Sequence, residues 1–116
     1  MSEILTVALL QYDVAWLDVR KNLIKIETMC SKLNEKADII FLPEMFATGF
    51  TVYPENLNIE DQFLVIDFLI KLSDKYQSSF TGSYPFTSEG KFYNRLFFVS
   101  PGSKVEYYNK RHLFSI

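Results

Sequence analysis

The stretch Phe41-Leu42-Pro43-Glu44-Met45-Phe46 decides the fold, because it closes an apolar run that begins at Ala37 and places an acid directly after it. Residues 37–42 have the short apolar pattern of a buried strand. Pro43 has no amide hydrogen to donate and therefore cannot extend the ladder of a central strand. The sequence thus predicts that Glu44 lies just past the carboxyl end of a strand.

The residues before this stretch predict a strand followed by a helix. Residues 4–10 form a nearly continuous apolar run, which is typical of a central strand buried on both faces. Asp18 can cap a helix in which apolar residues recur at spacings of three and four. The predicted buried stripe of this helix consists of Leu23, Ile26, Cys30, Leu33 and Ala37.

The residues after it predict a loop, a second helix and a set of strands. Residues 47–58 contain Gly49 and Pro54 and have the composition of a loop, and Asn58 can open a helix that runs to Tyr76. Three strands then follow at 79–84, 92–99 and 105–109, separated by turns, as in an antiparallel meander. We expect one α/β domain in which a mixed sheet carries both helices on one face and needs other cover on the second face.

Composition and charge exclude several classes of protein. The 116 residues are 48% hydrophobic and 16% aromatic, which predicts a folded domain or a piece of one. A formal net charge of -2 gives no reason to expect nucleic acid or an anionic membrane as a partner.

We find no secretion-signal pattern and no apolar run long enough to span a membrane, and therefore expect a cytoplasmic protein. A lone Cys30 and a lone His112 predict neither an internal disulfide nor a structural zinc site, so we expect no metal.

Four motifs carry a family resemblance that covers essentially the whole chain. They are Phe41-Leu42-Pro43-Glu44-Met45-Phe46, Thr48-Gly49-Phe50, Tyr93-Asn94-Arg95 and Tyr108-Asn109-Lys110-Arg111-His112-Leu113-Phe114. Together they resemble the nitrilase superfamily of carbon-nitrogen hydrolases, and most closely its omega-amidase branch. The resemblance implies a four-layer αββα sandwich, pairing of subunits through a helical face, and hydrolysis of amides or nitriles by a Glu, a Lys and a Cys without a cofactor. Residues 1–116 would then be the N-terminal portion of a single hydrolase domain, ending before the nucleophilic cysteine.

By position in these motifs, Glu44 resembles the general base of the family and Lys110 its oxyanion-stabilising cation. A carboxylate must take the thiol proton before sulfur can attack the amide carbon, and an ammonium stabilises charge that develops only in the transition state. Without such motifs, an acid after a strand is usually a solvated turn residue, and a lysine at a strand end is usually a surface charge. The motifs favour the catalytic interpretation of both. Phe46 and Phe50 are candidates for lining a substrate pocket, although packing in the core explains them equally well.

Two further residues have a structural interpretation. Cys30 lies on the predicted buried stripe of the first helix, where a thiol is normally an inert packing residue, so we do not expect it to be the nucleophile. His112 stands next to Leu113 and Phe114, which favours a structural hydrogen-bonding role over a Glu-His catalytic pair.

The sequence leaves two functional hypotheses. The first is the N-terminal part of an amidase that releases ammonia from the terminal amide of a small 2-oxo acid, such as 2-oxoglutaramate or 2-oxosuccinamate, and that forms a homo-oligomer when full length. The second is a catalytically inactive truncated product or an interaction fragment. In either case these residues alone lack a nucleophile, so we expect no amidase activity from them and, because one sheet face lacks cover, low solubility.

Overall fold

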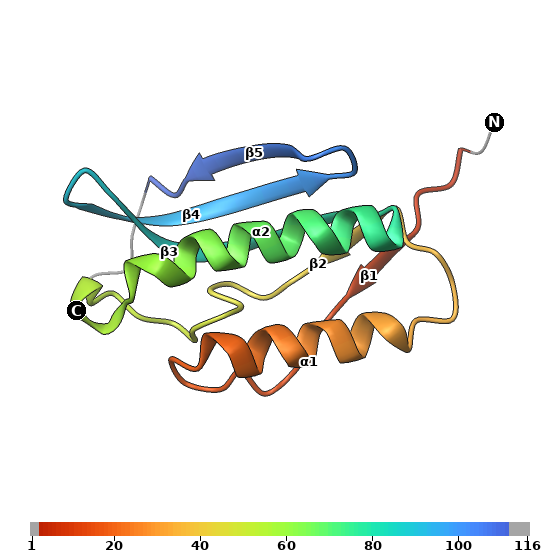
Figure 1. The fold of residues 1–116 in the computed structure, drawn as a ribbon. Helices are drawn as coiled ribbons and strands as arrows, with labels where there is room; N and C mark the ends of the chain where they lie inside the picture. The colour runs from red at the N-terminus through yellow and green to blue at the C-terminus, as the bar shows by residue number, and fades with distance from the viewer. Residues whose placement is uncertain (1–2, 112–116) are drawn as a thin grey trace.

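The computed structural model describes residues 3–111 and contains one five-stranded sheet and two α-helices (Figure 1). The strands are adjacent in the sheet in the order in which they occur in the chain: β1 (Val7–Leu9), β2 (Ile39–Phe41), β3 (Ser79–Ser88), β4 (Lys91–Ser100) and β5 (Lys104–Asn109). The helices are α1 (Val19–Ser31) and α2 (Ile59–Tyr76), and a short 3-10 turn, η1 (Pro54–Asn56), precedes α2. The prediction of an α/β fold with a mixed sheet is confirmed.

The strand directions bring distant parts of the chain to one end of the sheet. β1, β2 and β3 are parallel, whereas β3, β4 and β5 are joined as antiparallel neighbours. β5 therefore runs in the same direction as β2, and the carboxyl ends of these two strands lie at the same end of the sheet. β4 runs in the opposite direction, so its first residues lie at that end too.

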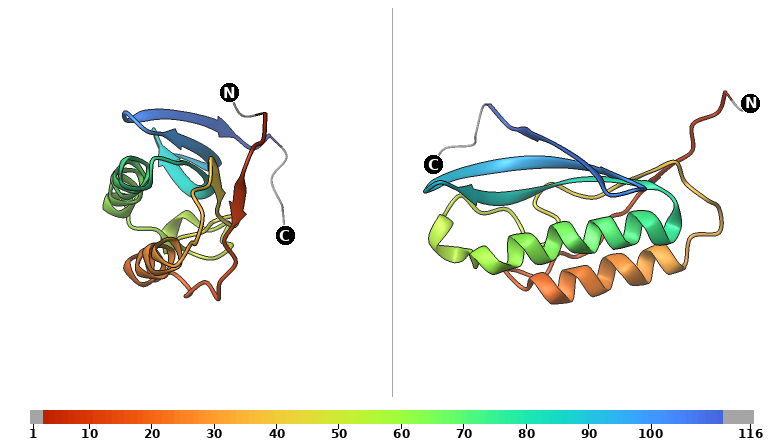
Figure 2. Two further views of the ribbon diagram at one scale, coloured as in Figure 1. Left: turned by 90° about the vertical axis from the view of Figure 1, so that its right-hand side faces the viewer. Right: turned by 45° about the horizontal axis from the view of Figure 1, so that its top comes forward.

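Both helices pack on the same face of the sheet, as predicted (Figure 2). Each begins where the sequence indicates: the Asp18 side chain accepts a hydrogen bond from the Lys21 amide, and the Asn58 side chain accepts one from the Glu60 amide. The core lies between the helices and the sheet. Its fully buried members include Ile26, Ile40, Val65, Leu69, Phe80 and Val99.

Within residues 3–111, no helix packs against the second face of the sheet. Side chains alternate between the two faces of a strand, so the neighbours of buried Ile40, Phe97 and Val99 point away from the helices. Large apolar side chains are exposed on this open face, namely Val7, Leu9, Phe41, Leu96 and Tyr108. The prediction that this face needs cover agrees with their exposure.

Two details of the predicted elements are wrong. β1 is at the edge of the sheet rather than at its centre, it is only three residues long, and its Leu9 is 75% exposed. The helix α1 ends at Ser31, so Leu33 and Ala37 are not part of its stripe. Ala37 is buried because it leads into β2, whereas Leu33 stays on the surface in the polar turn between the two elements.

Within residues 3–111, neither helix has both the length and the apolar character that crossing a membrane requires.

Candidate active site

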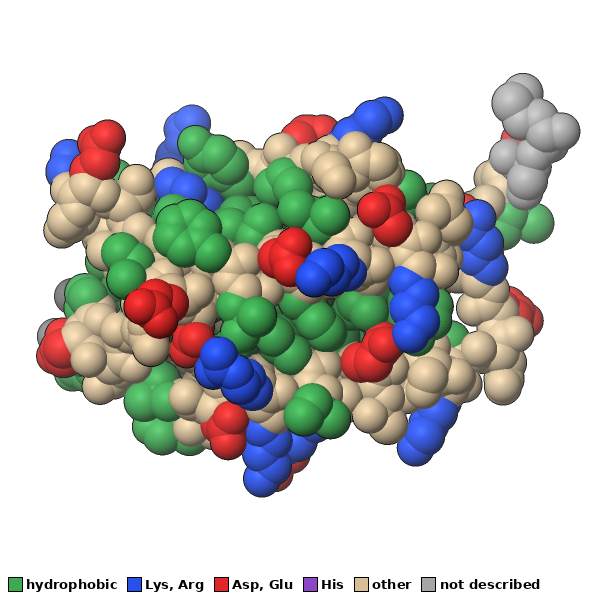
Figure 3. All heavy atoms as spheres, in the orientation of Figure 1, with side chains coloured by type: hydrophobic (Ala, Val, Ile, Leu, Met, Phe, Trp, Pro, Cys, Tyr) green, Lys and Arg blue, Asp and Glu red, His purple; other side chains and the backbone are tan. Residues whose placement is uncertain are grey.

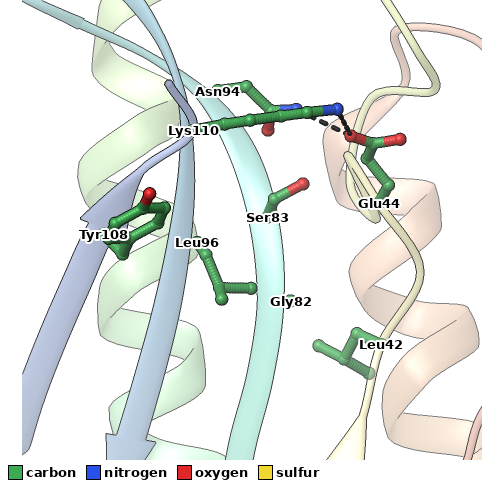
Figure 4. Close-up of a pocket in the computed structure, with 8 residues that line it drawn as sticks. All are labelled: Leu42, Glu44, Gly82, Ser83, Asn94, Leu96, Tyr108 and Lys110. Carbon is green, nitrogen blue, oxygen red and sulfur yellow. Dashed lines mark hydrogen bonds and ion pairs between the residues drawn. The ribbon is translucent and has the colours of Figure 1, made fainter. Parts of the chain in front are cut away.

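A pocket of about 320 Å³ opens on the open face at the end of the sheet where β2 and β5 finish. It is lined by Leu42, Glu44, Gly82, Ser83, Asn94, Leu96, Tyr108 and Lys110 (Figure 4). The structure therefore brings together Glu44 and Lys110, the two residues that the motifs nominated. They meet because one follows β2 and the other follows β5. These two strands finish at the same end of the sheet, with β3 and β4 between them.

Glu44 and Lys110 form an ion pair at the mouth of this pocket. Lys110 Nζ lies 3.4 Å from Glu44 Oε2, and the two side chains are 46% and 48% exposed. A pair this exposed stabilises a fold by little, because water screens it. Its significance is chemical: a carboxylate and an ammonium, of opposite charge, face one small cavity.

The backbone of Lys110 is fixed by the neighbouring strand. Its amide donates to the carbonyl oxygen of Asn94 at 2.9 Å, which continues the β4–β5 pairing one residue past the end of β5. The side chain of Asn94 also belongs to the site, since its Nδ2 donates to Glu44 Oε2 at 2.8 Å. Asn94 is itself 3% exposed.

The turn that carries Glu44 is anchored on β3. Met45 has a φ of 49°, in the left-handed region, and its amide donates to Ser83 Oγ at 2.9 Å. The Phe46 amide donates to the Ser83 carbonyl at 3.2 Å, and the Tyr12 hydroxyl donates to the Phe46 carbonyl at 2.8 Å. Burial raises the pKa of Tyr12 well above its usual range, so the phenol stays a neutral donor. The backbone that follows Glu44 is thus held by Ser83 through two amides and by Tyr12 through a carbonyl.

The two phenylalanines nominated for the pocket lie elsewhere. Phe46 is fully buried in the core, with its ring edge against Tyr84 at a centroid distance of 6.4 Å. Phe50 is 44% exposed in the following loop and is not part of the pocket lining. The core-packing interpretation thus fits Phe46. His112 lies outside the described residues.

Cys30 lies on the helical side of the sheet, away from the pocket. It is 2% exposed and lines a separate cavity with Lys75 and Tyr76. Burial, and then the nearby Glu27 carboxylate, raise the pKa of the Cys30 thiol to about 11, with Lys75 acting in the opposite direction. The predicted burial of Cys30 is confirmed. Among residues 3–111 no group of three or more His, Cys, Asp or Glu side chains is arranged to hold a metal ion.

Comparison with known proteins identifies the family. The model of the family described as carbon-nitrogen hydrolase matches residues 6–116. This chain belongs to the carbon-nitrogen hydrolase family. The resemblance carried by the motifs is therefore confirmed.

The curated relatives of this chain include amidases. It is 35% identical over 111 residues to omega-amidase YafV of Yersinia enterocolitica, covering 95% of this chain and 42% of the relative. It is 27% identical over 114 residues to 2-oxoglutaramate amidase of Bacillus subtilis, covering 96% of this chain and 44% of the relative. The chain thus spans about two fifths of the length of these curated relatives.

Solved structures agree with membership of the carbon-nitrogen hydrolase family. A carbon-nitrogen hydrolase superfamily protein of Xanthomonas campestris, crystallised with an arsenic adduct in its active site, matches with a TM-score of 0.83 and 27% identity over 95% of this chain and 42% of its own. An N-terminal amidase crystallised with an Asn-Glu-Ala peptide also gives a TM-score of 0.83, at 22% identity over 95% of this chain and 29% of its own. The second match supports the fold alone.

Several residues of the hydrolase pocket were not assigned a role from the sequence. Asn94 belongs to the motif Tyr93-Asn94-Arg95, which marked it as notable without indicating its contact with Glu44. Ser83 on β3 and Tyr108 on β5 enter through strand pairing, because both residues pair with Leu96 on β4. Only the register of the sheet reveals these residues, and register is not visible in a single sequence.

Proposed function

We propose that this chain is the N-terminal portion of a single amidase domain that hydrolyses the terminal amide of a small 2-oxo acid, of the 2-oxoglutaramate or 2-oxosuccinamate type. The observation that carries the proposal is the placement of Glu44 and Lys110, 3.4 Å apart, on one pocket of a carbon-nitrogen hydrolase fold. The substrate class rests on the names of the relatives, omega-amidase and 2-oxoglutaramate amidase. These relatives also favour the amidase over an inactive interaction fragment.

The proposed mechanism needs a cysteine from a part of the protein outside this chain. Glu44 takes the proton of the thiol, and the sulfur attacks the amide carbon while the carbonyl electron pair moves onto oxygen. The ammonium of Lys110 stabilises that oxyanion. Glu44 then returns the proton to the leaving nitrogen, so that ammonia departs and a thioester remains. In the second half, Glu44 takes a proton from water, the hydroxyl attacks the thioester, and the thiolate leaves and is protonated again.

The exposure of the pair is compatible with this chemistry. Glu44 and Lys110 stabilise the fold by little, so their ion pair can separate when substrate enters without a large cost in stability. Their positions do not depend on the ion pair, because Ser83 holds the Glu44 turn and Asn94 holds the Lys110 backbone. The site is thus pre-positioned by the sheet.

The test uses the whole protein that carries this chain. We expect ammonia release from 2-oxoglutaramate, and Glu44→Gln should lower kcat by about 100- to 10,000-fold because the general base is lost. Lys110→Met should lower kcat by at least about 100-fold, because an oxyanion donor is lost. Glutamine, which has an amino group where the substrate has the 2-oxo group, is the matched control compound. A whole protein that releases no ammonia from 2-oxoglutaramate, or that releases it from glutamine equally fast, would overturn the proposal.

The complete protein is further proposed to be a cytoplasmic homo-oligomer. A second copy of the chain is the expected partner of the helical face, where Ile24 and Phe63 are 67% and 63% exposed. Hydrophobic side chains gather between α1 and α2 on this face (Figure 3), and a groove there is lined by Leu23, Ile24, Leu64 and Phe68, among others. Native mass measurement of the whole protein tests this: a monomer at micromolar concentration would contradict it.

A further inference from the structure

We propose that Asn94 is a positioning residue for Glu44: its side-chain amide holds Oε2 of the carboxylate beside Lys110 and leaves Oε1 to exchange protons with the reacting groups. This inference rests on the proposed amidase function, since it assigns a task within the same site. It concerns a residue that touches both candidate catalytic groups but is not expected to touch the reacting atoms.

Asn94 links the two charged residues directly. Its Nδ2 donates to Glu44 Oε2 at 2.8 Å, and its carbonyl oxygen accepts from the Lys110 amide at 2.9 Å. A hydrogen bond to an ionised carboxylate is shorter and stronger than one between neutral groups. One residue on β4 therefore sets the position of the carboxylate and of the backbone that carries the ammonium.

The contacts on Glu44 are unequal. Oε2 accepts from both Asn94 Nδ2 and Lys110 Nζ, whereas Oε1 accepts from no group within residues 3–111. Figure 4 shows Oε1 pointing away from the two nitrogens. An oxygen that already accepts two hydrogen bonds, one of them from a cation, has less electron density to offer a proton. The geometry therefore gives the two oxygens of Glu44 different tasks: Oε2 is held by its two donors, and Oε1 is the oxygen that exchanges protons.

The other end of the Asn94 amide supports this assignment. Its Oδ1 is the buried side-chain polar atom that lacks a hydrogen-bond partner among the described residues. Leaving a buried acceptor unpaired costs free energy, so such an atom requires an explanation. Rotating the amide by half a turn would set Oδ1 against Glu44 Oε2, where two acceptors would repel each other. The orientation is thus dictated by the carboxylate, and the unpaired Oδ1 is its consequence.

Buried amides with a purely structural task are satisfied differently in this chain. Asn22 accepts from the Ala15 amide and donates to the carbonyls of Ala15 and Ala47. Gln62 accepts from the Thr87 amide and donates to the Thr87 carbonyl. Both side chains have partners at each end, and all of those partners are backbone groups. Asn94 differs in both respects. Its Nδ2 donates to a half-exposed carboxylate instead of a backbone group, and its Oδ1 has no hydrogen-bond partner among the described residues.

The burial of Asn94 makes it suited to this task. Glu44 and Lys110 are about half exposed and their side chains have room to move, whereas Asn94 is 3% exposed on β4, between β3 and β5. A fixed donor restricts the carboxylate to one orientation at little entropic cost at the moment of reaction. Removing the Asn94 amide would leave the charge of Glu44 in place, but the orientation of the carboxylate would no longer be fixed.

The experiment compares three variants in the whole protein that carries this chain. Asn94→Asp replaces Nδ2 by an oxygen of similar size, and Asn94→Ala removes the amide altogether. We expect both to lower kcat about 100-fold with little change in KM, because the general base is misplaced by roughly 1 Å while substrate contacts remain. Gln62→Ala is the matched control: it removes an equally buried amide away from the pocket and should lower the melting temperature without lowering kcat.

Two outcomes would overturn the inference. One is an Asn94→Ala protein that folds and keeps the kcat of the parent protein. The other is found without turnover, by measuring hydrogen exchange of the Asn94 side-chain amide in the parent protein and in Glu44→Ala. We expect faster exchange in Glu44→Ala, and equal rates would show that the carboxylate does not hold the amide. This second readout also separates the two proposals, because a protein without amidase activity contradicts the proposed function and leaves the Asn94–Glu44 contact to be judged by exchange.

Discussion

Gly82 on β3 lies so close to Leu42 that a Cβ atom built on Gly82 would come within 2.8 Å of the Leu42 Cβ and 2.9 Å of Phe46 Cδ2. Leu42 and Phe46 flank Glu44 in the chain: Leu42 precedes the turn that begins at Glu44, and Phe46 lies within that turn. The absence of a side chain at Gly82 therefore allows the Glu44 turn to settle against β3. The position of the candidate base depends on this close approach.

Gly82→Ala should consequently damage both stability and activity. Since neither contacting group is the free end of a flexible side chain, the Glu44 turn must shift, and we expect a loss of about 1–3 kcal/mol in the free energy of unfolding. A displacement of about 1 Å at Glu44 should also lower kcat roughly 100-fold. Thermal unfolding and amidase assays on the whole protein measure the two effects.

Gly90→Ala provides the control for this substitution. Gly90 sits in the turn between β3 and β4 with a φ of 76°, and a Cβ there would meet no atom within 4 Å among the described residues other than its chain neighbours. The change therefore strains only the local backbone and should leave kcat unaltered. If Gly82→Ala were as active as Gly90→Ala, the close approach at Gly82 would have no bearing on the site.

Ser83→Ala tests the second anchor of the Glu44 turn. Ser83 Oγ is the acceptor for the Met45 amide, and Met45 adopts a left-handed φ that a non-glycine residue adopts only when its surroundings impose it. Removing Oγ leaves a buried N–H without a partner, which should cost about 1–3 kcal/mol in the free energy of unfolding. Ser83→Thr retains the hydroxyl and should recover part of that loss. Equal stability of Ser83→Ala and the parent would contradict the anchoring role.

The sequence predicted the elements that carry Glu44 and Lys110 better than it predicted the environment of those residues. The strand-stopping Pro43 located Glu44 at a strand end, and the motif around Lys110 located the second group. Periodicity could not show that β2 and β5 end at the same side of the sheet, because that follows from the antiparallel course of β4 between β3 and β5. For the same reason the contact between Asn94 and Glu44 could not be predicted from the sequence.

The misplacement of β1 has a similar physical origin. A continuous apolar run such as residues 4–10 is expected for a strand with neighbours on both sides and also for an edge strand of a sheet whose second face is apolar. The exposed Leu9 and Val7 belong to that second face, so hydrophobicity in β1 reflects the open face rather than a central position. The role of Phe46 was ambiguous because core and pocket residues are equally apolar; its complete burial fits the core interpretation.

Cys30 should react slowly in the folded protein. Its pKa is raised from 9.0 to about 11, so at pH 8 the thiolate fraction falls on the order of 100-fold relative to the unfolded chain. Alkylation by iodoacetamide, followed by mass spectrometry with and without guanidinium, measures the difference. Similar rates in the two states would mean that the thiol is not buried as described.

The same shift makes stability depend on alkaline pH. Between pH 9 and about pH 11 the unfolded chain has lost the thiol proton while the folded chain retains it, so the unfolded state binds fewer protons and stability falls as pH rises. The contribution is fully present below pH 9 and is lost by about pH 11. Cys30→Ala should reduce this part of the pH dependence and leave kcat unchanged, because Cys30 lies on the helical side of the sheet. Loss of amidase activity in Cys30→Ala would instead point to a role for this thiol in the reaction.

The open face of the sheet should govern the behaviour of the 116-residue chain when it is produced by itself. Leu96 on β4 and Tyr108 on β5 are paired neighbours on that face, 44% and 52% exposed, and Phe41 and Leu9 extend the apolar surface to β1. A contiguous apolar face of this kind promotes association in water. We expect the isolated chain to elute as large species in size-exclusion chromatography with light scattering, and Leu96→Thr should reduce their fraction. Val105→Thr changes a valine of comparable exposure, 38%, on the opposite face and should have a smaller effect. An isolated chain that is monomeric and melts cooperatively would contradict this prediction, because it would show that the open face tolerates water without a covering layer.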